Sequence, residues 1–86
     1  MNRRDFLLLK VSPSREVVLS CEALYMRFLD ARDDGSMPRL FQTLSDDLDR
    51  TREVRLTETS WLSDDVFRQE LEPLLDSFRK RGGHIL

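Results

Sequence analysis

The feature that most constrains this chain is a short apolar run near its start, the sequence Phe-Leu-Leu-Leu at positions 6–9. Charged residues precede it and Lys10 follows it, and nowhere else do four large apolar side chains stand in succession. A strand whose residues are all apolar must be covered on both faces, as in the interior of a parallel sheet. The run therefore predicts a buried central strand.

The same stretch, Arg3-Arg4-Asp5-Phe6-Leu7, also resembles the opening of a twin-arginine export signal, which implies a protein sent to the periplasm. Such a signal continues with an apolar region of about 7 to 15 residues and ends in small residues at a cleavage site. In this chain Lys10 interrupts that region, and no Ala-x-Ala follows. We expect the strand, with export as the alternative.

The chain further resembles a group of short bacterial proteins for which no activity is known. The resemblance lies in the segments 2–8, 19–22 and 24–27 and in the closing segment 78–83, with the sequence Phe-Arg-Lys-Arg-Gly-Gly. It implies a compact domain and no catalytic residue.

Length and charge narrow the classes of protein that fit. The chain has 86 residues, which predicts one domain over residues 1–86. Fourteen basic and sixteen acidic side chains leave a net charge of −2, without the basic excess that nucleic-acid binding requires. We expect no nucleic-acid partner, no membrane association and, because a single cysteine suits a reducing compartment, a cytoplasmic protein.

Capping signals and periodicity predict the remaining elements. Ser12-Pro13-Ser14 is typical of a helix start, and apolar residues at three- and four-residue spacing extend that helix to about Ala31. A second helix follows Ser36, and Ser63 is expected to cap a third that ends at Gly82. Alternating apolar residues over 52–58 predict a strand with one wet face, and residues 84–86 predict a last short strand.

This order of elements, β-α-α-β-α-β, predicts a small α/β fold with a three-stranded, mostly parallel sheet. With the strand at 6–9 in the centre, the strand order is 2-1-3. The two crossovers then run in opposite directions, which places helices on both faces of the sheet.

In a parallel sheet, ligands bind beyond the carboxyl ends of the strands. The predicted fold places Ser12, Ser14, Ser60 and Trp61 at that edge, which makes them the candidate ligand-binding residues. The serines are equally explained as helix caps, and Trp61 as a lid over the core. No glycine-rich phosphate motif occurs, and we expect no cofactor.

No catalytic residue and no metal site are expected. Cys21 falls on the apolar face of the first helix, and His84 is expected to be terminal and solvated. The aspartates at 46, 47 and 49 point in different directions on a helix, so they predict a solvated face and not a metal site.

Leu19 and Met26 lie opposite the apolar stripe of the first predicted helix, seven residues apart. Either the second helix covers them, or they form a contact surface for another chain. The sequence therefore favours a small interaction or accessory module that binds another protein or itself, as a possible homodimer. A ligand-binding or catalytic domain using the edge at Ser12 and Trp61 is the alternative, and a twin-arginine-exported protein is the third hypothesis.

Overall fold

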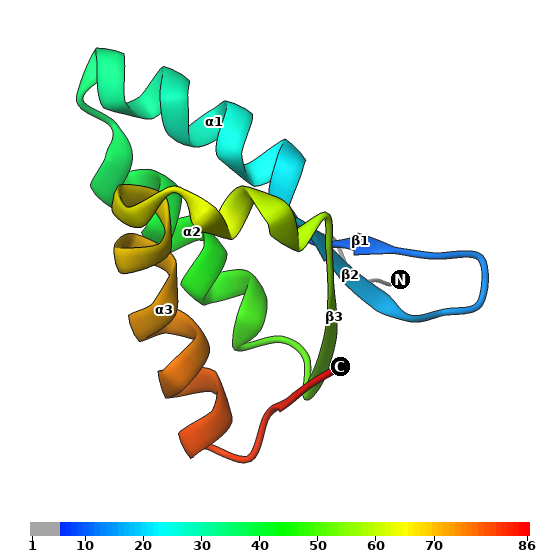
Figure 1. The fold of residues 1–86 in the computed structure, drawn as a ribbon. Helices are drawn as coiled ribbons and strands as arrows, with labels where there is room; N and C mark the ends of the chain where they lie inside the picture. Colours follow the sequence, from blue (N-terminus) through cyan, green and yellow to red (C-terminus); the bar gives the residue numbers. More distant parts are fainter. Residues whose placement is uncertain (1–5) are drawn as a thin grey trace.

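The fold is a small mixed α/β domain with three helices and a four-stranded sheet, seen in a computed structural model that describes residues 6–86 (Figure 1). The twin-arginine motif falls largely on residues 1–5 and so lies outside the described residues. The elements in chain order are β1 (Lys10–Val11), β2 (Val17–Ser20), α1 (Cys21–Asp34), α2 (Met37–Leu48), β3 (Glu53–Thr57), the 3-10 helix η1 (Thr59–Ser63), α3 (Asp65–Lys80) and β4 (His84–Ile85).

The sheet has the strand order β1-β2-β3-β4. β1 and β2 form an antiparallel hairpin, whereas β2 with β3 and β3 with β4 are parallel pairs. The register aligns Val18 with Arg55 and Leu19 with Leu56. The predicted order 2-1-3 is therefore wrong, since the last strand lies beside β3 and does not cross to the far edge.

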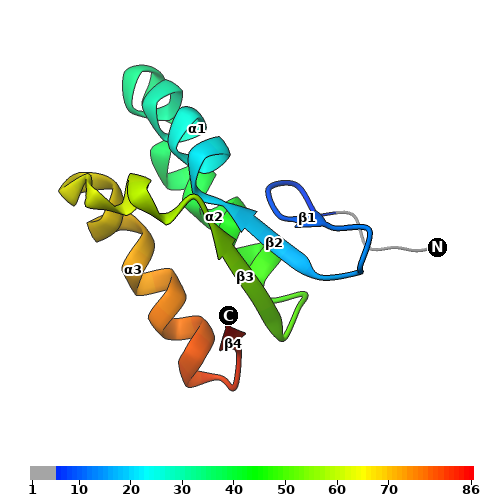
Figure 2. The same cartoon turned by 45° about the vertical axis from the view of Figure 1, so that its right-hand side comes forward.

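All three helices lie on one face of the sheet (Figures 1 and 2). The connections from β2 to β3 and from β3 to β4 each move one strand in the same direction. Right-handed crossovers that move in one direction place their helices on one face. The prediction of helices on both faces is wrong for this reason.

The core lies between the helices and the inward face of the sheet. Leu19 and Val54 project into it from β2 and β3, and Phe28, Phe67 and Phe78 are almost fully buried against them. The aromatic rings contact one another, with the centroids of Phe28 and Phe67 5.3 Å apart. None of the helices in residues 6–86 has the length and apolar character that crossing a membrane requires.

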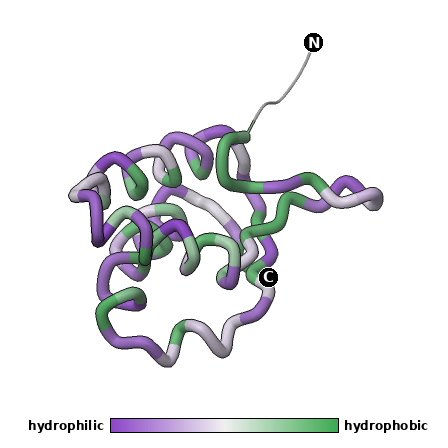
Figure 3. The backbone as a smooth tube through the Cα atoms, turned by 90° about the horizontal axis from the view of Figure 1, so that it is seen from above, coloured by the Kyte–Doolittle hydropathy of each residue, from purple (hydrophilic) through white to green (hydrophobic). Residues whose placement is uncertain are grey.

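Residues 6–9 form no strand, which contradicts the central expectation from the sequence. Their backbone is held by the carboxylate of Asp47 near the end of α2, which accepts N–H bonds from Leu7 at 3.1 Å, Leu8 at 2.6 Å and Leu9 at 3.1 Å. Only Leu9 is buried, and Leu7 is 72% exposed. Asp47 itself is 2% exposed, so its prediction as part of a solvated face is also wrong. This apolar segment turns before it enters the hairpin (Figure 3).

Residues 12–20 do not begin a helix. Ser12 lies in the hairpin turn, where its backbone N–H donates to the Glu16 carbonyl at 2.8 Å. The chain then continues as β2, and α1 starts only after Ser20, whose side chain accepts the Ala23 N–H at 3.1 Å. Gly35 ends α1 with a φ of 80°, a left-handed conformation that glycine adopts without steric cost.

The later elements follow the sequence expectations more closely. α2 has Pro38 in its first turn, β3 alternates between buried and exposed residues, and β4 occupies two of the three predicted positions. The helix cap expected at Ser63 is instead Asp64, which accepts the Phe67 N–H at 3.0 Å. The inward placement of Val54 and the exposure of Arg55 confirm one covered and one open face of the strand.

The contacts of Asp47 predict a large loss of stability for Asp47→Ala. The substitution leaves three backbone N–H groups without their charged acceptor, and a hydrogen bond to a charged group contributes about 1.5 to 3 kcal/mol. Because water can reach part of this segment, we expect the free energy of unfolding to fall by about 3 kcal/mol in urea titrations. The neighbouring Asp46 is exposed and within residues 6–86 its side chain binds only Gln42, so Asp46→Ala should cost less than about 0.5 kcal/mol. Equal losses for the two variants would contradict the role of Asp47.

Candidate functional site

Several polar and aromatic side chains gather at the carboxyl edge of the parallel pair β2 and β3. β2 ends at Ser20 directly before α1, and β3 ends at Thr57 before η1 and α3. The loops that follow both strands therefore meet at one edge, as is usual for binding sites in open α/β sheets.

Ser20 and Glu58 join the two strand ends. The Ser20 hydroxyl donates to the Glu58 carboxylate while its oxygen accepts the first-turn N–H of Ala23. The hydrogen bond from Ser20 lowers the pKa of Glu58 below its ordinary value. Glu58 has a φ of 56°, a left-handed conformation that is uncommon for a residue other than glycine. The hydrogen bond between Ser20 and Glu58 thus joins the carboxyl ends of β2 and β3.

Cys21 follows Ser20 and is fully buried in the core. Burial, followed by the negative charge of Glu58, raises the pKa of its thiol. A thiol with a raised pKa and no access to solvent is a poor nucleophile. Its position confirms the prediction of a core residue.

A shallow pocket of about 480 Å³ lies next to this edge and is lined by Tyr25, Ser60, Trp61, Ser63 and Asp64. The ring of Tyr25 lies against the ring of Trp61, with centroids 4.8 Å apart, and meets the edge of Phe67 at 5.2 Å. The pocket therefore has an aromatic floor that continues into the core.

Asp64 provides the carboxylate of this pocket. It accepts the backbone N–H of Phe67 at 3.0 Å and the hydroxyl of Tyr25 at 2.8 Å. These two bonds, that of Phe67 first, hold the pKa of Asp64 below its ordinary value, and the same contact raises the pKa of Tyr25. The carboxylate thus fixes the start of α3 to the side of α1.

The structure separates the four candidate ligand-binding residues into two places. Ser60 is exposed beside Trp61 at the pocket, as the carboxyl-edge prediction expected. Ser12 and Ser14 lie in the β1–β2 hairpin turn, where their hydroxyl groups are 2.9 Å apart. That turn precedes β2, so it lies at the amino ends of the parallel strands. The prediction that these serines share an edge with Trp61 is wrong because residues 12–20 form a hairpin and not a helix start.

Leu19 and Met26 do not form an exposed pair. Leu19 lies in β2 and is 1% exposed, with its side chain in the core, whereas Met26 on α1 is 47% exposed. The expected pairing depended on both residues lying on one helix, and only Met26 does. Leu19 is therefore removed from the candidate interaction surface.

His84 lies in β4 with an exposed side chain, opposite Glu53 in the register of β3. Within residues 6–86 no group of three or more His, Cys, Asp or Glu side chains is arranged to hold a metal ion. The arrangement at the carboxyl edge thus supplies hydrogen-bond acceptors and aromatic surface.

Sequence reasoning missed the residues that organise this edge, namely Ser20, Tyr25, Glu58 and Asp64. One signal was available, because Asp64 stands three residues before Phe67 in the spacing of a helix cap, as suitable as Ser63. The contact of Tyr25 with Asp64 joins residues 39 positions apart and leaves no local pattern.

Comparison with known proteins gives no further assignment. The chain has no significant match among protein-family models, curated proteins or solved structures.

The lowered pKa of Asp64 predicts a pH-dependent loss in Asp64→Asn, which keeps the capping oxygen but removes the charge. A carboxylate whose pKa is lower in the folded state stabilises the fold at pH values above its unfolded pKa of about 3.9. This stabilisation disappears as the pH falls through the folded pKa. The urea midpoint of Asp64→Asn, followed by Trp61 fluorescence, should be below that of the wild type at neutral pH, and the two should converge in acid.

Tyr25→Phe serves as the companion variant, because it removes the hydroxyl donor and leaves the ring packing on Trp61. It should lower the midpoint at neutral pH in the same direction. A difference between Asp64→Asn and the wild type that is the same at neutral and acid pH would contradict the charged contact.

Proposed function

We propose that this protein is a small protein-interaction module without catalytic activity of its own, and that it binds a partner protein through the uncovered face of its sheet. The observation that supports this is the placement of all three helices on one side (Figure 2). No helix in residues 6–86 covers the opposite face, which carries Lys10, Val18, Ser20, Arg55 and Thr57.

The chemistry of this face suits a transient partner. Val18 lies in its register between Lys10 and Arg55, and Arg55 forms an ion pair with Glu16 at 2.9 Å. Interfaces between proteins that also exist apart are about as polar as the rest of the surface, so a mixed face of this kind fits that class.

Strand-to-strand pairing at the sheet edges receives less support. β1 and β4 are the two edge strands, and each is two residues long. Short edge strands offer few unpaired backbone groups to a second chain. We therefore place the partner on the open face, and a homodimer formed at the edges is the weaker form of this proposal.

The pocket at Trp61 supports a second candidate function, the binding of a small ligand. Its aromatic floor and the carboxylate of Asp64 are the combination that recognises a cation or a cationic aromatic compound. It is second because Asp64 and Tyr25 already satisfy each other.

Site-specific photo-crosslinking in the source cells tests the first proposal. A crosslinking residue at position 55 or 57 on the open face should give one discrete heavier adduct with a partner protein. Position 70, exposed on α3, is the matched control and should give none. Equal adducts from both surfaces, or none from positions 55 and 57, would overturn the proposal, and an adduct of twice the chain mass would favour the homodimer.

Titration of Trp61 fluorescence tests the second candidate. Trp61 is the only tryptophan, so a ligand that packs on its ring should change the emission directly. Quaternary ammonium and guanidinium compounds should shift it with saturation, and Tyr25→Ala should weaken that response about tenfold. A linear, unsaturated response to the whole panel would remove this candidate.

A further inference from the structure

A groove of about 490 Å³ lies between α1 and α2, with Leu7 and Leu8 on its third side. Its lining combines apolar side chains with charged side chains of both signs. The apolar ones include Leu7, Leu8 and Leu40, and the charged ones are Arg27, Asp30, Asp34 and Arg39.

Leu7 forms an apolar projection at this groove. Its side chain is 72% exposed, more than that of any other large apolar residue in residues 6–86. Its backbone is nevertheless held in place, because its N–H donates to the buried carboxylate of Asp47 at 3.1 Å. A projection that is already ordered loses little further freedom when it binds. Beside it, Leu8 and Leu40 are half-buried and form apolar walls of the recess.

Arg27 and Asp30 lie about one turn apart on the flank of α1 that lines the groove. Both are exposed, and neither side chain forms a hydrogen bond or ion pair with another part of residues 6–86. On a helix, the order in which the acidic residue precedes the basic one is the better one for pairing. Asp65 and Arg68 have that order and pair within α3 at 2.7 Å. Arg27 and Asp30 have the reverse order and remain open to a second chain.

The other two charged side chains of the groove interact with each other. Asp34 accepts the hydroxyl of Ser36 at 2.6 Å and its backbone N–H at 2.9 Å, and the positive charge of Arg39 acts on the same carboxylate. The groove thus carries two positive and two negative charges. A partner with charges of one sign would meet like charges in it.

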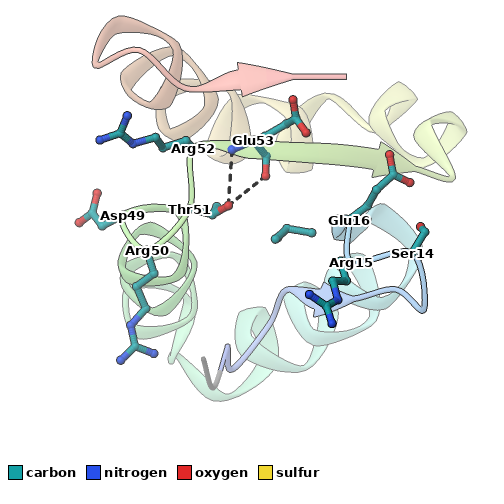
Figure 4. Close-up of a pocket in the computed structure, with 9 residues that line it drawn as sticks. Ser14, Arg15, Glu16, Asp49, Arg50, Thr51, Arg52 and Glu53 are labelled. Carbon is teal, nitrogen blue, oxygen red and sulfur yellow. Dashed lines mark hydrogen bonds between the residues drawn. The ribbon is translucent and has the colours of Figure 1, made fainter. Parts of the chain in front are cut away.

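The cleft between the hairpin turn and the loop from α2 to β3 has a different lining (Figure 4). Three arginines stand there beside three carboxylates, and of the nine lining residues only Val17 is apolar. Figure 4 shows the guanidinium groups of Arg50 and Arg52 extending away from this cleft. It therefore offers a second chain little apolar surface and no preferred sign of charge.

The surface at the α1–α2 groove is complementary to itself. In a symmetric dimer the same patch of each copy meets the other about a two-fold axis. If the two α1 helices run antiparallel about an axis between positions 27 and 30, Arg27 of each copy lies opposite Asp30 of the other, and the ion pair forms twice. A projection beside a recess has the same property, because each copy can insert Leu7 into the recess of the other.

We propose that this groove is the interface of a symmetric homodimer, in which Leu7, Arg27 and Asp30 make the central contacts. A chain of 86 residues buries a modest share of its surface on folding, and a second copy covers more of it. The groove shares no residue with the open sheet face that carries Lys10, Val18, Ser20, Arg55 and Thr57. The dimer therefore leaves both open faces accessible, and this proposal does not rest on the proposed function.

Sedimentation equilibrium on the full chain tests the ion pairs. The wild type should approach twice the chain mass at high micromolar concentration. Arg27→Asp and Asp30→Arg should each weaken association about tenfold or more, because each places like charges opposite one another twice. An equal mixture of these two variants should associate again, since one copy then carries two acids and the other two bases. Asp33→Arg, exposed on α1 outside the groove, is the matched control and should change the affinity less than about twofold.

Leu7→Gln tests the apolar projection. The variant keeps the backbone N–H that Asp47 accepts, so its far-UV circular dichroism should match that of the wild type. Its dimer should dissociate about tenfold more readily, because the contact is lost from both copies. Val66→Gln removes another exposed apolar side chain, on α3 and outside the groove, and should leave the affinity within about twofold of the wild type.

The contradicting outcomes are distinct from those of the partner-binding test. A chain that stays monomeric over the whole concentration range, or a mixture of Arg27→Asp and Asp30→Arg that fails to associate, would overturn the proposal. A mass that grows beyond the dimer would overturn the symmetric contact. A monomer that crosslinks from position 7 to a different protein in the source cells would give the groove another occupant and overturn it as well. Adducts from positions 55 and 57 are independent of each of these results.

Discussion

The carboxylate of Asp47 is the interaction on which the arrangement of the first half of the chain depends. Three consecutive backbone N–H groups, those of Leu7, Leu8 and Leu9, donate to it. A segment that lies in no sheet must find other partners for its buried backbone groups, and a single buried carboxylate supplies three of them. The contact brings Leu9 into the core and delivers the chain to β1, from which the hairpin and β2 follow.

The direction of the crossovers then determines which surfaces remain open. Because β2, β3 and β4 are added in one direction, the three helices share one face, and the core has two layers instead of three. The open face is thus a consequence of topology, whereas its polar character comes from the sequence, since Arg55 and Thr57 alternate with the buried Val54 and the half-buried Leu56 along β3.

Local patterns in the sequence predict the second half of this fold well and the first half poorly. α2, α3 and β3 have the apolar periodicity that their sequences predict, and the structure confirms these elements, although the cap of α3 is Asp64 and not Ser63. The apolar run at 6–9 wrongly predicts a strand, because the partner of its backbone N–H groups is Asp47, about 40 residues away, and no local pattern indicates it. Val17 and Val18 fitted a helical stripe, although their branched side chains favour a strand and Ser20 is an equally good helix cap. The predicted ligand-binding residues show the same difference. Trp61 follows the correctly predicted strand β3, whereas Ser12 follows the run at 6–9, which forms no strand.

The two ends of the parallel strands differ in how far their polar groups are already satisfied. At the carboxyl end, where open α/β sheets usually bind ligands, Ser20 binds Glu58 and Tyr25 binds Asp64, so an incoming ligand must replace existing bonds. At the amino end Arg15 and Arg52 have no such partners within residues 6–86. The polar groups at the carboxyl end are thus bound to one another, and these bonds hold the ends of β2 and β3 to the first turns of α1 and α3.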